Sequence, residues 1–240
     1  MAEKLELTSI TKRIHWPLLI KAAAFGFSWF ILPFWLFLVI GIYFYFVPLF
    51  RPKDLAFPFA ALIFFAYTEE RSFLLAVLFA ALFYLIIGVK DLILINRQSA
   101  KEVLSLLFAL FLAVKFFSFA DSWNRTSILG YSFIASIFVF FLAKLFITSD
   151  LASGRETANK KTIISLLAVS FFIWQMFLVL VYLPLNFLYQ SAIFIVTATI
   201  FLELFSDHIR SVLTRRKILL HFSIFLVFVA TILVSAQWAL

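Results

Sequence analysis

Long apolar runs separated by short polar connectors fill this sequence. Eight runs follow one another, at residues 25–50, 55–68, 72–89, 103–120, 127–148, 162–185, 187–204 and 218–238. A helix rises about 1.5 Å per residue and the hydrocarbon core of a bilayer is about 30 Å thick, so runs of about 18 residues or more can span it. The pattern predicts an all-α, polytopic integral membrane protein.

The run 55–68 is the exception in length. Its 14 residues reach about 21 Å as a helix, which is too short for a comfortable crossing. The run 25–50 is long enough to cross once with a kink at Pro33. We therefore expect about seven transmembrane helices plus one short re-entrant or interfacial helix at 55–68.

The N-terminal segment differs from the rest because basic residues alternate with apolar ones. Lys4, Lys12, Arg13 and Lys21 accompany Trp16, an arrangement typical of a helix lying at the membrane surface. We expect residues 1–21 to form an interfacial segment and residues 22–240 to form a single transmembrane helical domain.

Lysine and arginine alternate between successive connectors, and this alternation predicts the orientation. Connectors 90–101, 149–161 and 205–217 carry three, three and four Lys or Arg residues, whereas 121–126 and 185–190 carry one and none. Basic residues in short loops face the cytoplasm. We expect a bacterial or archaeal plasma membrane, with the N-terminus cytoplasmic and the C-terminus and the Glu69-Glu70-Arg71 connector external.

Composition narrows the function classes. The chain is 65% hydrophobic and 13% charged, has a net charge of +8, five glycines and no cysteine. The charge is explained by the connectors, so we expect membrane lipids and other membrane subunits as partners and no nucleic acid. Thiolate metal sites and cysteine nucleophiles are excluded, no glycine-rich phosphate-binding loop occurs, and the cofactor stays unknown.

Glu203 and Asp207 are the first candidates for chemistry. They are four residues apart and therefore share a helix face, and His208 and His221 lie nearby in the chain. Two carboxylates and His221 are a ligand set for a divalent metal or a catalytic acid–base group. Alternatively, Asp207 caps the following stretch and Glu203 pairs with Lys144 or Arg210.

Glu69 and Glu70 are the second candidates. As a carboxylate pair at the mouth of a re-entrant segment they suit ion gating or acid–base catalysis. The structural alternative is that Thr68 caps the next helix and both acids lie in its first turn, where they complement the helix dipole.

Three function classes fit this pattern. The first is a transport or channel protein or a membrane-complex subunit, the second an intramembrane enzyme acting on a lipid or another hydrophobic substrate, and the third a structural assembly partner. The 35 phenylalanines suit either an aromatic-lined cavity for a lipid-like ligand or bulk facing the membrane, and Ala76 and Ala80 have the spacing of a helix-packing face. Binding or transport ranks slightly ahead of catalysis.

Overall fold

The fold is all-helical over the residues that the structure describes. The computed structural model describes residues 15–47, 55–91, 97–120, 122–151, 160–209 and 212–235, and no strand occurs among them. The helices are α2 (Trp16–Ile31), α3 (Phe34–Phe46), α4 (Ala56–Thr68), α5 (Phe73–Lys90), α6 (Arg97–Ala120), α7 (Arg125–Leu151), α8 (Lys160–Val181), α9 (Phe187–Ile209) and α10 (Arg215–Ser235). The expectation of an all-α chain is confirmed.

Five of these helices are long and apolar enough to cross a membrane. Their spanning stretches are Phe73–Lys90, Ser99–Ala120, Arg125–Phe146, Phe187–His208 and Arg215–Ser235. The chain therefore has the character of a multi-pass membrane protein, and the expected number of seven crossings stays a prediction.

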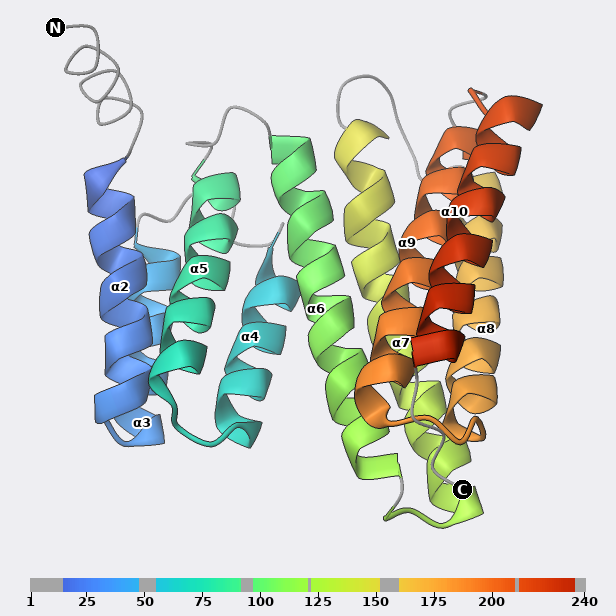
Figure 1. Cartoon of the computed structure of the whole chain (residues 1–240). Helices are drawn as coiled ribbons and strands as arrows, with labels where there is room; N and C mark the ends of the chain where they lie inside the picture. Colours follow the sequence, from blue (N-terminus) through green and yellow to red (C-terminus); the bar gives the residue numbers. More distant parts are fainter. Residues whose placement is uncertain are drawn as a thin grey trace, which may run out of the picture. The chain divides into compact units, whose positions relative to one another are not determined.

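The chain divides into two compact units, Met1–Leu104 and Ser105–Leu240. In unit 1, helices α2 to α5 lie side by side and alternate in direction (Figure 1). The prediction of an interfacial segment at 1–21 falls largely on residues 1–14, which lie outside the described part, and α2 begins at Trp16.

The run 25–50 folds back on itself, and this corrects the expectation of one kinked crossing. Backbone at Leu32 and Pro33 is extended, with ψ near 150°, so one helix ends and another begins. The Lys21 ammonium, early in α2, donates to the carbonyl of Val47, just past α3, over 3.0 Å. Proline removes a donor and clashes with the preceding turn, and here this breaks the helix instead of bending it.

Side chains from other parts of unit 1 donate to backbone carbonyls at the C-terminal ends of α2, α3 and α4. Lys90 donates to the carbonyl of Tyr45 at the end of α3. Arg71 donates to Leu32 past α2 over 2.7 Å, and the Trp29 indole donates to Ala66 near the end of α4 over 2.7 Å. The last carbonyls of a helix have no partner within it, and an apolar medium makes that costly, so these donors stabilise short helices.

The run 55–68 forms a single helix, α4, which packs against α5. Tyr45 at the end of α3 stacks on Phe59 with ring centroids 4.2 Å apart, while Trp29 bonds the opposite end of α4. Thus α4 extends along unit 1 between its two ends. Whether it spans the bilayer or re-enters stays a prediction.

Aromatic rings and one glycine hold α2 against α5. Phe25 stacks on Phe83 at 4.0 Å between centroids, and Trp29 meets Phe79 edge-on at 4.8 Å. A Cβ added to Gly26 would lie 2.5 Å from the Ala76 carbonyl oxygen and 2.9 Å from the Ala80 methyl. The Ala76/Ala80 spacing is therefore a packing face, as its pattern predicted, and its partner is a glycine.

Unit 2 has a core of packed phenylalanines from α6, α8 and α9. Phe117, Phe177 and Phe194 are buried together, with the rings of Phe177 and Phe194 stacked at 4.3 Å between centroids. The Trp174 indole donates to the Ser132 hydroxyl over 3.0 Å, which links α8 to α7.

Helix α10 is much less buried than the other spanning helices. Only 6% of its spanning window is buried, compared with 39–50% for the other four windows. It packs chiefly against α9, and Ile232 is its buried residue. Its attachment to α9 must therefore be explained by something other than extensive apolar burial.

Candidate functional site

Two polar contacts join α9 to α10 in one register. The Lys217 ammonium donates to the Asp207 carboxylate over 2.8 Å, and His221 Nε2 lies 2.9 Å from Glu203 Oε2. Each helix contributes two residues four apart, so the contacts form successive rungs, which we call the α9–α10 ladder. The site hypothesis required both carboxylates to converge with His221; Glu203 contacts His221, whereas Asp207 bonds Lys217.

The three candidates from the sequence do not meet at one point, because Glu203 pairs with His221 and Asp207 pairs with Lys217. Among the described residues, no group of three His, Cys, Asp or Glu side chains is arranged to hold a metal ion. The exposed His208 adjoins Asp207 on α9. Whether Glu203, Asp207 or His221 takes part in catalysis or metal binding stays a prediction.

Glu69 and Glu70 lie in the connector between α4 and α5. The Ser72 hydroxyl accepts from the Leu75 N–H over 3.2 Å, so Ser72 caps α5. The expectation that Thr68 is this cap, with both acids in the first turn of the helix, is therefore wrong. Thr68 ends α4 instead, and its hydroxyl donates to Phe65 over 3.1 Å. A catalytic or gating role for Glu69 and Glu70 stays a prediction.

An apolar groove runs along the outer side of the α2–α5 pair. One cavity, of about 190 Å³, is lined by Ala23, Gly26, Phe27, Phe30, Phe73, Ala76, Val77 and Ala80. A second, of about 440 Å³, is lined by Leu19, Ala22, Ala23, Val77, Ala80, Ala81, Tyr84 and Leu85. Because the two share Ala23, Val77 and Ala80, we describe them together as the α2–α5 groove.

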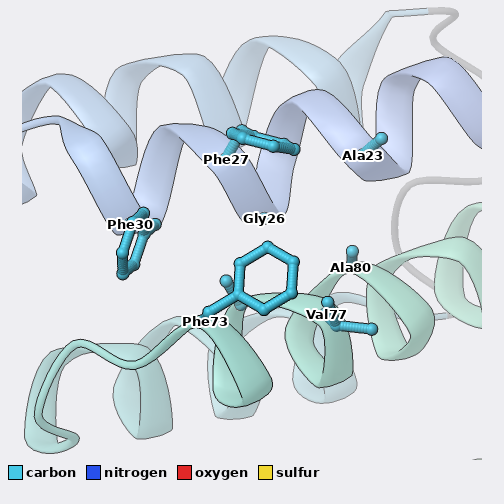
Figure 2. A pocket seen from close by; sticks show the side chains of 8 residues that line it. Ala23, Gly26, Phe27, Phe30, Phe73, Val77 and Ala80 are labelled. Carbon is cyan, nitrogen blue, oxygen red and sulfur yellow. The ribbon is translucent and has the colours of Figure 1, made fainter.

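The close approach of the two helices creates this groove. Figure 2 shows Ala23, Phe27 and Phe30 of α2 facing Phe73, Val77 and Ala80 of α5 across it. Gly26 and the alanines give it a floor of small groups, and the phenylalanines form walls at one end. Tyr84 lines the groove near the other end and contributes a hydroxyl group. Such a groove can hold a slender apolar group and offers no acid or base for catalysis.

Sequence reasoning missed the groove although one of its signals was present. The Ala76/Ala80 spacing marked one wall, but the opposing wall comes from a helix about 50 residues earlier. No local pattern pairs Gly26 with Ala76, since that pairing depends on the fold-back at Pro33.

Comparison with known proteins gives no family to which the chain could be assigned. No protein-family model, no curated protein and no solved structure matches it. The site itself must therefore carry any proposal about function.

Proposed function

We propose that this chain is a multi-pass membrane protein that binds the acyl chain of a membrane lipid in the α2–α5 groove. The observation that carries the proposal is the continuous apolar lining shared by the two cavities of about 190 and 440 Å³. Ligand pockets are concave and mostly apolar, with a few polar groups that fix orientation. Among the function classes, this favours binding or transport of a lipid-like molecule over catalysis.

The dimensions of the groove suit one extended chain. Its lining on α2 runs from Leu19 to Phe30, which corresponds to about 16 Å along the helix axis. The floor of small side chains lets a polymethylene chain lie close to the backbone. Burying each CH₂ group there contributes about 0.8 kcal/mol when it leaves water, so specificity against bulk lipid must come from shape and from the ends of the groove.

The two ends of the groove differ, and this orients the ligand. Phe30 and Phe73 close one end with apolar rings 6.5 Å apart. Tyr84 lines the other end, and Trp16, which is 53% exposed, lies one turn before Leu19 on α2. Tyrosine and tryptophan favour the level of the lipid headgroups. We therefore place the headgroup at the Trp16–Tyr84 end.

Charge favours an anionic headgroup at that end. Lys21 lies there, and its ammonium donates to the carbonyl of Val47 just past α3. In the sequence, Arg51 and Lys53 belong to the connector that follows α3 and lie outside the described residues, whereas Arg71 is the basic residue of the α4–α5 connector at the opposite end. Basic groups at the membrane surface attract anionic lipids, worth about 1 kcal/mol each.

The same distribution supports the orientation of the chain. If the basic end of unit 1 faces the cytoplasm, the N-terminus and the 48–54 connector are cytoplasmic and Glu69-Glu70-Arg71 is external. Single cysteines at Lys53 and Arg71 of this cysteine-free chain should react with an impermeant thiol reagent from opposite sides of the membrane.

The test of lipid binding uses a photoactivatable lipid. The purified chain is reconstituted in vesicles of phosphatidylglycerol and phosphatidylcholine that contain a trace of phosphatidylglycerol with a diazirine in one acyl chain. After illumination, peptides are mapped by mass spectrometry. We expect adducts enriched at Ala23, Val77 and Ala80, and at least a twofold loss of these adducts in Ala23→Phe, which fills the groove.

Ala60→Phe is the matched control, because Ala60 is an exposed alanine of α4 in the same unit. It should leave the adducts unchanged. Adducts spread evenly over all exposed helices, with no effect of Ala23→Phe, would show that lipid merely solvates the groove. A diazirine-labelled phosphatidylcholine that labels as strongly as phosphatidylglycerol would retain the acyl-chain site and remove the preference for an anionic headgroup.

A further inference from the structure

The Glu203–His221 rung has a fixed arrangement of hydrogen-bond donors and acceptors. His221 Nδ1 lies 2.8 Å from the carbonyl oxygen of Lys217. A carbonyl oxygen can only accept, so Nδ1 must carry a hydrogen. The other ring nitrogen, Nε2, faces Glu203 Oε2 at 2.9 Å, and the state of this second contact follows from the first.

A proton must lie between Glu203 and His221. If Nε2 and the carboxylate were both unprotonated, two lone pairs would face each other at 2.9 Å and repel. With one proton, the pair is either imidazolium with carboxylate or neutral imidazole with carboxylic acid. Both forms carry zero net charge, which lowers the cost of placing the pair within a membrane helix.

We propose that Glu203 and His221 form a proton-binding site, and that its proton attaches the first half of α10 to α9. In that half of α10, the ladder supplies both polar ties, while Ile232, together with Val229 and Leu233, provides apolar contact in the second half. Loss of the proton turns the Glu203–His221 tie into a repulsion. Only the Asp207–Lys217 tie then remains at that end among the described contacts.

The surroundings allow such a proton to exchange. The Glu203 side chain is 50% exposed and that of His221 is 17% exposed. Other ionisable side chains described at this end of α7, α9 and α10 are Lys144, Asp207, His208, Arg215, Arg216 and Lys217. Asp207 and Lys217 bond each other. The exposed His208 is the other histidine described at this end, so the test must separate it from His221.

The test measures the position of α10 against pH in the full chain. Spin labels are attached to single cysteines at the exposed Leu167 of α8 and Leu219 of α10, and the protein is placed in lipid nanodiscs. Distance distributions are recorded by pulsed electron spin resonance from about pH 5 to about pH 9. We expect a narrow distribution at the acidic end and at least a twofold broader one at the alkaline end.

Substitutions identify which side chain causes the pH dependence of the α10 position. Glu203→Gln and His221→Gln should each abolish the pH dependence, whereas His208→Gln, which removes the neighbouring histidine, should keep it. Circular dichroism of each variant checks that the helices have formed. If only one of Glu203→Gln and His221→Gln folds, that variant alone is sufficient for the test. Three outcomes would each overturn the proposal. The parent protein could show no pH dependence, the response could survive in both Glu203→Gln and His221→Gln, or it could disappear in His208→Gln.

Discussion

The α2–α5 and α9–α10 pairs are both antiparallel, yet they are held together by different means. In the first, Gly26 brings the backbones together and buried rings such as Phe25 and Phe83 fill the contact. In the second, α10 has Ile232 as its buried residue, and the ladder ties its other end. The first arrangement is closely packed and lines an apolar groove. The second depends on protonation, so the two pairs suit ligand binding and conformational response respectively.

The difference extends to the ion pairs of the two regions. Lys90 in unit 1 is fully buried, with its ammonium 3.3 Å from the Asp91 carboxylate, while the Lys217 side chain of the ladder is 44% exposed. Breaking a buried pair leaves an uncompensated charge, whereas an exposed pair is screened by its surroundings. Substitutions of these ion pairs should therefore lower the free energy of unfolding by different amounts in the two regions.

Lys90→Met should have the largest effect. It removes the cation beside Asp91 and the donor to the Tyr45 carbonyl, so we expect a loss of about 3–5 kcal/mol in the free energy of unfolding. The measurement is denaturant unfolding in mixed micelles. Lys21→Met is the matched control, because Lys21 also bonds the end of α3 but is more exposed; it should cost about 1 kcal/mol. Equal losses would mean that burial does not distinguish the two lysines.

Gly26→Ala should have the next largest effect. Its methyl group would lie 2.5 Å from the Ala76 carbonyl oxygen, so the helices must separate, at a cost of about 1–3 kcal/mol. Gly130→Ala in α7 is the control, because beyond its chain neighbours and the local backbone of its own helix no atom lies within 4 Å of the added carbon. Alanine favours a helix over glycine by about 1 kcal/mol, so this variant should be neutral or stabilising. Thermal unfolding of both variants measures the difference, and similar melting temperatures would contradict tight α2–α5 packing.

The sequence predicted most of what depends on local pattern. The apolar runs at 72–89 and 187–204 match α5 and α9 closely, because length and hydropathy mark such helices. The four-residue spacing of Glu203 and Asp207 placed them on one helix face, and of the three groups that the site hypothesis required to converge, Glu203 and His221 are in contact. What pairs with Asp207 was missed, because several cations occur in the α9–α10 connector and only the register of the hairpin selects Lys217.

The errors occur where tertiary contacts compete with pattern. The run 25–50 contains no charged residue to mark a turn, so its length indicated one crossing, while Pro33 allows two helices. Arg71 stabilises that turn from a position about 40 residues later, which no local pattern shows. Thr68 and Ser72 are both good caps, but α4 includes Thr68 as its last residue, and Ser72 caps α5.

Breaking the Asp207–Lys217 rung should have the smallest effect on the free energy of unfolding. Its side chains are 18% and 44% exposed, so we expect a coupling energy of about 0–1 kcal/mol. The measurement is a double-mutant cycle of Asp207→Ala, Lys217→Met and the double variant, using unfolding free energies, because the cycle cancels effects that each change has on its own. The single variants should keep the pH response of the Glu203–His221 rung, since they leave both of its groups in place. A coupling energy above about 2 kcal/mol would show that the ladder is effectively desolvated. In that case α10 would be firmly fixed by charge, and loss of one proton could not release it.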